Sequence, residues 1–210
     1  MRFLFVLLLS AQAALADGEP AGEFDYYVLS LSWSPNWCDL EGDDRDSPQC
    51  ETGSGFGWVL HGLWPQYESG WPSYCRTTER NPSRADTAAQ ASLYGSSGSA
   101  WHQWNKHGRC SGLSADEFYS LSQHAYDRIS RPEIFRKLSK PVRLPASVVE
   151  EAFLEANPKL GPNQITITCK QGQIQEARIC LTLELEPRRC GYDVIRDCTL
   201  NDARFAPLRN

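Results

Sequence analysis

The segment WHQWNKHG, at residues 101–108, places two histidines, a lysine and the side-chain amide of Gln103 within six consecutive positions. In a helix, His102 and Lys106 lie one turn apart on the same side. Gln103 and His107 form a second such pair about 100° further around the helix axis, so the four polar side chains share one broad face. A cluster of donors and cations of this kind is suited to holding an anion such as phosphate. The segment therefore predicts a functional site on a helix.

The residues around this cluster predict how the helix packs and where it ends. Gly108 is a typical C-terminal stop, and Cys110, two positions later, predicts that this end is tied down covalently. Trp101 and Trp104 lie off the polar face and are free to pack elsewhere. The alternative is an ordinary amphipathic helix with tryptophans in the core. A second histidine segment, around His61, favours the functional interpretation.

Length and the first residues predict one exported domain. The chain has 210 residues, of which 41% are hydrophobic, which is enough for a single domain with a sizeable core. Its beginning has the charged, apolar and small-residue regions of a secretory signal, with the apolar run at residues 3–9. That run is too short to span a bilayer. We expect cleavage after Ala16, so that residues 1–16 are the signal peptide and residues 17–210 form the domain.

Eight cysteines form an even set in a chain with an export signal, which favours four disulfides. Zinc binding is the alternative, but zinc sites usually contain cysteines with only two to four residues between them. The nearest cysteines here are eight positions apart, so we expect no metal site. The eight positions are Cys38, Cys50, Cys75, Cys110, Cys169, Cys180, Cys190 and Cys198.

The formal net charge of −5 limits the kinds of partner to expect. Removal of the predicted signal also removes Arg2, so 20 basic side chains remain against 26 acidic ones, a charge of −6. Proteins that bind nucleic acid tightly through charge are usually basic. The composition argues against such a binder, but it is compatible with an enzyme that needs only a local anion site.

The segment FGWVLHGLWPQ, at residues 56–66, contains His61 and predicts a buried strand that ends at Pro65. Gly62 allows another part of the chain to approach closely, and Trp64 offers a flat ring for stacking. A lone histidine in a buried strand is more often a satisfied core residue than a catalyst. The alternation predicts Val59, His61 and Leu63 on one face and Trp58, Leu60 and Trp64 on the other.

The remaining segments predict a mixture of strands and helices. A buried strand is expected at residues 24–33 and a surface loop at residues 39–55. Ser114 and Glu117 form a capping box that starts a helix, and His124 on that helix reads as an ordinary surface histidine. The expected helices cover residues 83–93, 115–129 and 147–157, and a β-hairpin covers residues 164–169 and 173–185, with its turn at Gln171-Gly172.

Three histidines and a lysine, with few carboxylates expected nearby, narrow the possible chemistry. Glycosidases and aspartic proteases need paired acids, and the sequence has no Gly-x-Ser-x-Gly elbow. His102 and His107 are five positions apart, whereas the zincin motif needs four. RNA suits two imidazoles, because its 2′-hydroxyl is a built-in nucleophile. One imidazole takes the hydroxyl proton, the other protonates the departing 5′ oxygen, and Lys106 stabilises the phosphorane.

Two segments together carry a resemblance to a known family. WVLHGLWPQ and HQWNKHGRC, in this order and spacing, resemble the two active-site segments of the ribonuclease T2 family. YYVLSLSWSPNWC resembles the first strand of that family, so the resemblance covers nearly all of residues 17–210. It implies an α+β fold with a central antiparallel β-sheet flanked by helices and stapled by four disulfides. The implied bridges are Cys38 with Cys50, Cys75 with Cys110, Cys169 with Cys198, and Cys180 with Cys190.

The resemblance also implies a role for each matching residue. His107 is expected to be the general base and His61 the general acid. His102 and Lys106 are expected to contact the phosphate and the transition state. Trp64 is expected to help hold the base on the 5′ side of the cut.

Two features depart from the usual pattern of the family. Gln103 stands where a glutamate is common, and its amide can donate a hydrogen bond to a phosphoryl oxygen but cannot exchange a proton. We expect activity to survive this change, with the rate and the pH profile left open. LSLSWSP, at residues 29–35, lacks the glutamine that many relatives carry before this tryptophan, so a second base site stays unassigned.

The expected function is an exported endoribonuclease, periplasmic or secreted, that cleaves single-stranded RNA with low base specificity through a 2′,3′-cyclic phosphate. We expect no cofactor and no metal ion, RNA as the partner, no DNA or membrane binding, and a monomer. The alternatives are a secreted protein of this fold that acts by binding, with catalysis weakened by Gln103, and a disulfide-rich zinc protein. The pairing of His61 with His107 favours the enzyme, because a pure binding protein does not need it.

Overall fold

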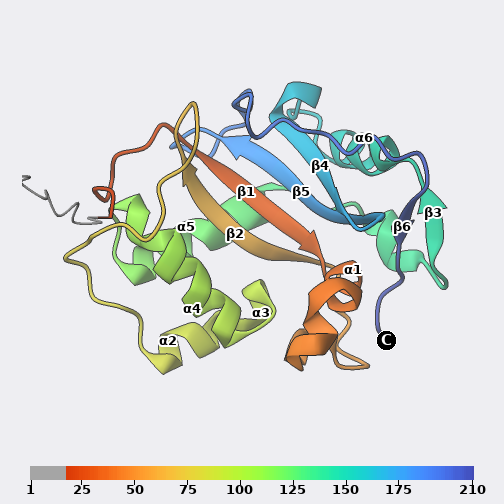
Figure 1. The fold of residues 1–210 in the computed structure, drawn as a ribbon, viewed down its shortest axis with the longest axis horizontal. Coiled ribbons are helices and arrows are strands. Elements are labelled where there is room, and N and C mark those ends of the chain that lie inside the picture. The colour runs from red at the N-terminus through yellow and green to blue at the C-terminus, as the bar shows by residue number, and fades with distance from the viewer. Residues whose placement is uncertain (1–17) are drawn as a thin grey trace, which may run out of the picture.

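The computed structural model describes residues 18–210, which form a six-stranded sheet in the order β2-β1-β5-β6-β3, with β4 paired to β5 (Figure 1). The predicted signal peptide at residues 1–16 lies outside the described residues. The pairings are antiparallel except for the short contact between β5 and β6. The strands are β1 (Tyr26–Trp33), β2 (Trp58–Gln66), β3 (Val142–Leu144), β4 (Ile165–Lys170), β5 (Gln173–Leu181) and β6 (Ala203–Phe205).

Helices flank the sheet at two places. Figure 1 shows α2 to α5 gathered along the β2 edge and α6 beside β4 and β3 at the other end. The expected α+β arrangement around a central sheet is therefore confirmed. Among the helices of this described part, none combines the length and the apolar character that a membrane crossing requires. The helices are α1 (Ser34–Trp37), α2 (Arg84–Ala89), α3 (Ala91–Tyr94), α4 (Ser97–Lys106), α5 (Ala115–Arg128) and α6 (Ala146–Ala156).

β1 is buried along its whole length between β2 and β5, as its aromatic and apolar sequence predicts. One of its faces enters the main core, where Trp33 stacks on Phe205 with 4.6 Å between the ring centroids. The alternating positions on the other face include Ser30 and Ser32, whose small side chains leave room above the sheet. The core-facing residues are Tyr27, Leu29, Leu31 and Trp33.

β2 extends through Pro65, whereas the sequence pattern predicts that this proline ends the strand. Pro65 pairs with Tyr27 of β1, and β2 lies at one end of the strand order, at an edge of the sheet that residues 18–210 form. An edge strand tolerates proline because the missing N–H can lie on the side that faces away from the neighbouring strand. The prediction of an early end is therefore wrong.

A β-bulge in β2 decides which side chains share a face. The pairing between β1 and β2 shifts register in mid-strand, and His61 is the extra residue on β2. Leu60 and Leu63 therefore both enter the core, although they are three positions apart. His61 and Trp64 lie together on the other face, with their ring centroids 5.1 Å apart. The prediction that His61 shares a face with Leu63, and Trp64 with Leu60, is wrong because the bulge interrupts the two-residue period.

The segment WHQWNKHG begins in the middle of α4, which ends at Lys106 with His107 as its C-terminal cap. Gly108 follows, as predicted, but it does not adopt the left-handed conformation of a glycine stop. A Cβ at Gly108 would lie only 2.6 Å from a ring atom of Trp104. The glycine is therefore required by close packing against the core, and the helix continues into a 3₁₀ turn.

The four disulfides are those that the resemblance implies, and they leave no cysteine free to bind zinc. The sequence predicts a loop at residues 39–55, but most of residues 39–50 form short helical turns, which the disulfide between Cys38 and Cys50 links. The disulfides are Cys38–Cys50, Cys75–Cys110, Cys169–Cys198 and Cys180–Cys190.

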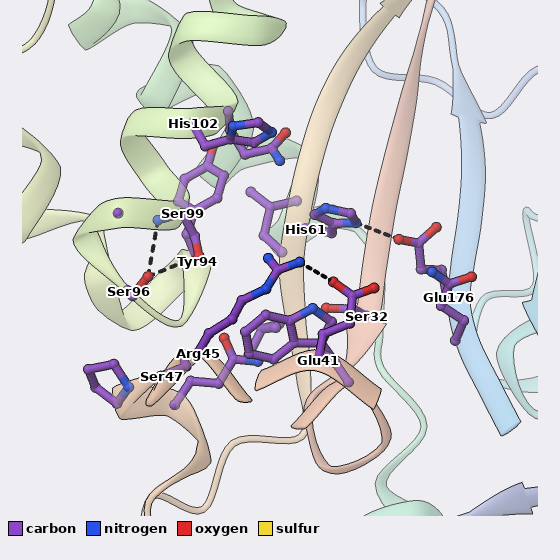
Figure 2. Close-up of a pocket in the computed structure, with 18 residues that line it drawn as sticks. Ser32, Glu41, Arg45, Ser47, His61, Tyr94, Ser96, Ser99, His102 and Glu176 are labelled. Carbon is purple, nitrogen blue, oxygen red and sulfur yellow. Dashed lines mark hydrogen bonds and ion pairs between the residues drawn. The ribbon is translucent and has the colours of Figure 1, made fainter. Parts of the chain in front are cut away.

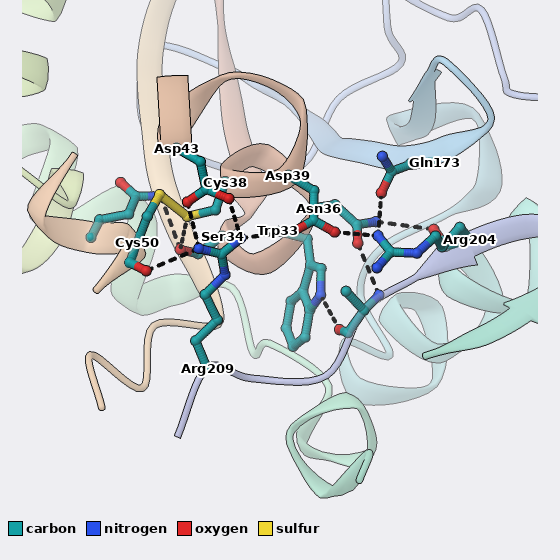
Figure 3. A network of polar contacts seen from close by, with 12 residues as sticks. Trp33, Ser34, Asn36, Cys38, Asp39, Asp43, Cys50, Gln173, Arg204 and Arg209 are labelled. Atoms are coloured by element: carbon teal, nitrogen blue, oxygen red, sulfur yellow. Dashed lines mark hydrogen bonds and ion pairs between the residues drawn. A yellow bond between two sulfur atoms is a disulfide. The ribbon is translucent and has the colours of Figure 1, made fainter. Parts of the chain in front are cut away.

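The C-terminal residues are pinned to the segment that follows β1 (Figure 3). Asn36 is fully buried, and its amide donates hydrogen bonds to the carbonyl oxygens of Ile174 at 2.8 Å and Arg204 at 3.0 Å. Its Oδ1 accepts a hydrogen bond from Ala206 N at 2.9 Å. A buried amide with all of these partners stabilises the crossing of three chain segments, because leaving any of its groups unpaired is costly.

The other predicted elements lie close to their expected places. β4 and β5 form the hairpin, and Gln171 and Gly172 both have positive φ, as a two-residue turn requires. Ser114 and Glu117 form the capping box of α5, and α6 begins one residue earlier than predicted. His124 is exposed on α5, in agreement with its reading as a surface histidine.

Candidate active site

The candidate site lies where β2, β5 and the C-terminal end of α4 meet. β2 contributes two rings from the face opposite the core, and α4 contributes four polar residues from its last turns and cap. The six residues that the sequence singled out line one cavity of about 320 Å³. They are His61, Trp64, His102, Gln103, Lys106 and His107.

His61 has a carboxylate partner. Its Nδ1 forms a hydrogen-bonded ion pair with Oε1 of Glu176 on β5, and Figure 2 shows the two side chains reaching toward each other over β1. Glu176 is only 2% exposed, whereas the side chain of His61 is 41% exposed. Because Nδ1 is occupied, Nε2 is the ring nitrogen left to contact a substrate.

Arg178 is the second partner of this carboxylate. Its Nε and Nη2 lie 2.8 and 2.7 Å from Oε2 of Glu176. Burial alone would raise the pKa of Glu176, but the charges and hydrogen bonds of His61 and Arg178 outweigh burial and lower it to about 2. Glu176 is therefore a carboxylate at neutral pH, with one oxygen for each partner. Arg178 also lies 5.4 Å from the ring centroid of Trp64.

His107 lies in a different environment. It is 5% exposed and stacks on Trp64, with 5.3 Å between the ring centroids and 27° between the ring planes. Its Nδ1 has no hydrogen-bond partner in the part of the chain that the structure describes. Burial lowers the pKa of His107 to about 2, with further contributions from Lys106, His61 and His102. The ring is therefore neutral at neutral pH.

Lys106 adds a positive charge to the cavity, and His102 lines the cavity beside it. Partial burial lowers the pKa of His102, and the charge of Lys106 lowers it further. The carbonyl of Lys106 accepts a hydrogen bond from Tyr74 N at 2.9 Å, next to the bridge between Cys75 and Cys110. This covalent and hydrogen-bonded anchor fixes the end of the helix, as the sequence predicts.

Gln103 is tied to β2 through Trp64. Its Oε1 accepts a hydrogen bond from Trp64 Nε1 at 2.8 Å, and the residue is 2% exposed. A Cβ on Gly62 would overlap both of these atoms, so the close approach predicted at Gly62 is confirmed. Because Oε1 is occupied, the NH₂ group of the amide is the part left to donate toward the cavity.

A second, larger cavity of about 570 Å³ adjoins the first (Figure 2). The segment after β1 lines it with Arg45 and Glu41, which form an ion pair at 2.6 Å, and α4 lines it with Ser99. The two cavities share His61, His102, Gln103, Gln175 and Glu176. A linear ligand can therefore lie across the histidines, with room on both sides.

Glu176 and Arg178 are not predicted by the local sequence pattern, and the expectation of few nearby carboxylates is wrong for His61. A signal is present in QEAR at residues 175–178, because residues two apart in a strand share a face. The face becomes part of the site because β5 pairs with β1, and this pairing brings Glu176 opposite Ser32. The local sequence does not predict a long-range strand pairing of this kind.

The arrangement supplies two imidazoles in different surroundings, one paired with a carboxylate and one buried against an indole ring, with a lysine and an amide beside them. Such a set can take one proton and deliver another next to an anion. Within residues 18–210, no group of three or more His, Cys, Asp or Glu side chains is arranged to hold a metal ion.

Sequence comparisons relate the chain to nucleases. The profile described as "Ribonuclease T2 family" matches residues 24–190. A ribonuclease of Aeromonas hydrophila is 48% identical over 112 residues, which are 53% of this chain and 49% of the relative. A probable ribonuclease of Haemophilus influenzae is 32% identical over 128 residues, 55% of this chain and 46% of the relative. The chain thus spans about half the length of these curated relatives.

Structural comparisons relate the fold to proteins of known structure. An RNase-related protein from Calystegia sepium superposes with a TM-score of 0.66 at 21% identity, over 90% of this chain and 99% of that chain. RNase NT in complex with 5′-AMP superposes with a TM-score of 0.62 at 19% identity, over 89% of this chain and 100% of that chain. At these identities the likeness establishes the shared fold.

Proposed function

The chain belongs to the ribonuclease T2 family, and we propose that it is an exported endoribonuclease that cleaves single-stranded RNA with low base specificity. Cleavage transfers the phosphate to the 2′-hydroxyl, and the resulting 2′,3′-cyclic phosphate is then hydrolysed to a 3′-phosphate. The convergence of His61, His107 and Lys106 in one cavity is the observation that carries this proposal.

His107 is the general base. Its pKa is lowered to about 2, so the ring is neutral and can accept the proton of the 2′-hydroxyl. A bound phosphate brings a negative charge that offsets the neighbouring cations, which makes the protonated ring easier to form during the reaction. The stacked ring of Trp64 holds the imidazole in place without a carboxylate.

His61 is the general acid. Its Nδ1 faces Glu176, so the proton on Nε2 is the one available to the departing 5′ oxygen. In the second step the neutral ring takes a proton from water, which attacks the cyclic phosphate, and His107 returns its proton to the 2′ oxygen. Each histidine thus ends the two steps in the state in which it began.

The charge that develops on the phosphorane is stabilised by donors of α4. Lys106 and His102 lie one turn apart and line the same cavity. Gln103 adds a neutral donor, because its oxygen is held by Trp64 and its NH₂ group remains. Fixed donors aimed at developing charge are among the larger contributions to catalysis.

We assign to Trp64, which lines the cavity beside His107, a part in holding the base on the 5′ side of the cut. Stacking on an aromatic ring tolerates every base, because each base has a π-face, and it is consistent with low base specificity. Export is supported by the four disulfides, which form and persist in oxidising compartments.

Digestion of homopolymer RNAs in the presence of EDTA, with identification of the end groups, tests this function. We expect cleavage of each homopolymer, cyclic phosphates early and 3′-phosphates late, and no cleavage of all-DNA strands. The matched control is His124→Ala, which alters a histidine outside the site and should cleave like the wild type. Binding of RNA without cleavage would support the alternative of a binding protein, and loss of cleavage with EDTA would contradict the mechanism.

A further inference from the structure

Glu176 is the buried charged group beside the histidines to which the family resemblance assigns no role. We propose that Glu176 is a positioning residue that holds His61 with Nε2 toward the substrate and supplies the negative charge opposite its protonated ring. This inference rests on the proposed function, because it concerns the residue to which the acid role is given.

The sheet is built so that Glu176 and His61 can meet. They belong to β5 and β2, which are separated by β1, and Glu176 pairs with Ser32 of β1. Ser30 and Ser32 face the same side as Glu176, and side chains this small leave the space above β1 open. The β-bulge turns His61 toward that space. The alternating serines of LSLSWSP thus clear the path between the two strands.

The division of the two carboxylate oxygens distinguishes this arrangement from an ordinary ion pair within a strand. Arg178 contacts Oε2 alone, through two nitrogens at 2.8 and 2.7 Å. Oε1 is left for Nδ1 of His61. A buried carboxylate is stable only when it is paired, and the arginine lets a negative charge lie beside an anion-binding cavity without repelling RNA strongly.

The proton on Nδ1 stays with His61 throughout. Glu176 accepts a hydrogen bond and takes no proton, while the proton on Nε2 passes to the 5′ oxygen as the bond between phosphorus and that oxygen breaks. A carboxylate in this place fixes the tautomer of the ring and stabilises its charged form. Besides Glu176 and Arg178, the charged or titratable side chains that line the two cavities around His61 are Glu41, Arg45, Tyr94, His102, Lys106, His107 and Asp193.

Glu176→Gln is the decisive variant, because it keeps the shape of the side chain and removes its charge. We expect kcat on a dinucleotide to fall by about 10- to 100-fold, taking as a guide the range found for carboxylates that orient metal-binding histidines. The alkaline limb of the pH–rate profile should move to lower pH, because the protonated ring loses its counter-charge. Glu186→Gln, which alters an exposed ion pair with Arg128, is the matched control and should change neither quantity.

A double-mutant cycle separates positioning from simple stabilisation of β5. In a His61→Ala background, Glu176→Gln should cause no further loss of kcat, since the residue through which it acts is gone. An equal loss in both backgrounds would overturn the inference, as would a Glu176→Gln variant with unchanged kcat and an unchanged alkaline limb. Unfolding curves of each variant establish that the compared proteins are folded.

A readout without turnover keeps this inference separate from the proposed function. The ¹⁵N chemical shifts of the His61 ring report which nitrogen carries the proton. We expect Nδ1 to be protonated in the wild type and the tautomers to mix in Glu176→Gln. If the protein cleaves no RNA but this shift is seen, the proposed function fails and the positioning stands. If RNA is cleaved and the tautomer does not change, the positioning fails alone.

Discussion

His61 and His107 line the same cavity, yet the protein holds them in opposite ways. His61 lies on an edge strand, is partly exposed and pairs with the carboxylate of Glu176. His107 caps α4, is buried, stacks on Trp64, and has an Nδ1 without a hydrogen-bond partner among the described residues. The first environment suits a charged ring and the second a neutral one.

This difference teaches how one residue type can serve two opposite proton transfers. An acid must begin protonated and a base must begin neutral, and both imidazoles have the same intrinsic chemistry. Strand pairing brings the carboxylate to one histidine, and the end of a helix buries the other. In our proposal the two roles are therefore set by the fold around each ring.

Removal of either ring is the strongest way to break the comparison. His61→Ala and His107→Ala should each lower kcat by roughly 10²–10⁴-fold, the range for a positioned acid or base. His124→Ala should leave kcat close to the wild-type value, because the side chain is exposed and lies outside the cavity. Steady-state kinetics on a dinucleotide provide the measurement, and equal losses from all three substitutions would show that the roles are misassigned.

The bridge between Cys75 and Cys110 anchors the end of α4, which carries His107, whereas His61 lies on β2. Closing a loop of 35 residues stabilises by about 3–4 kcal/mol in the chain-entropy model. Replacing both cysteines with alanine should cost that much in urea unfolding and lower kcat. Loss of Cys180–Cys190, with its shorter separation of 10, serves as the comparison and should cost less. Thiol titration of the unfolded, unreduced protein should detect no free thiol. Unchanged stability after loss of the Cys75–Cys110 disulfide would contradict its role as an anchor of the helix end.

Gln103 lines the same cavity as the two histidines and sharpens the comparison. Gln103→Ala should lose up to about 100-fold in kcat, as for deletion of one transition-state donor. Gln103→Glu should remain active, because a carboxylate can still accept the hydrogen bond of Trp64. It should add an acid-side dependence near a carboxyl pKa of about 4.3. A pH–rate profile of both variants tests this, and an alanine variant that matches the wild type at every pH would place Gln103 outside the transition state.

Acid should affect the two sides of the site over different pH ranges. The folded pKa of His107 is about 2 against an ordinary 6.5, so the unfolded chain binds more protons between these values. The free energy of unfolding therefore decreases as the pH falls below about 6.5. The pKa of Glu176 is lowered from 4.5 to about 2, so the stability that this carboxylate contributes is lost only below about pH 4.5. Urea unfolding at a series of pH values gives the free energy of unfolding as a function of pH. Between about pH 4.5 and 6.5 this free energy should depend less on pH in His107→Ala than in the wild type, whereas Glu176→Gln should follow the wild type there. A flat wild-type curve there would contradict the buried neutral ring.

Local pattern was enough to predict the elements that carry most of the site. The spacing of His102, Gln103, Lys106 and His107 defines one helix face whatever the helix packs against, and the structure places all four around one cavity. The capping box at Ser114 and the hairpin turn at Gln171 are likewise short-range signals, and both are confirmed. The family resemblance supplied the disulfide pairing, which spacing alone leaves open.

Features that depend on strand neighbours could not be predicted in this way. The bulge at His61 arises from its register against β1, and the tolerance of Pro65 arises from the edge position of β2. The contact between His61 and Glu176 joins residues 115 positions apart. Hydrophobic periodicity describes one strand at a time, so it cannot predict a contact with a side chain of another strand.

The leaving group of the substrate offers the most direct test of the opposite roles of His61 and His107. A nucleoside 3′-(p-nitrophenyl phosphate) releases a phenolate, which departs without a proton, whereas a dinucleotide releases an alkoxide that needs one. The kinetics of wild type, His61→Ala and His107→Ala are compared on both substrates. We expect His61→Ala to recover most of its roughly 10²–10⁴-fold loss on the aryl substrate, while His107→Ala stays impaired on both. Recovery by His107→Ala instead, or by neither variant, would contradict the assignment of acid and base.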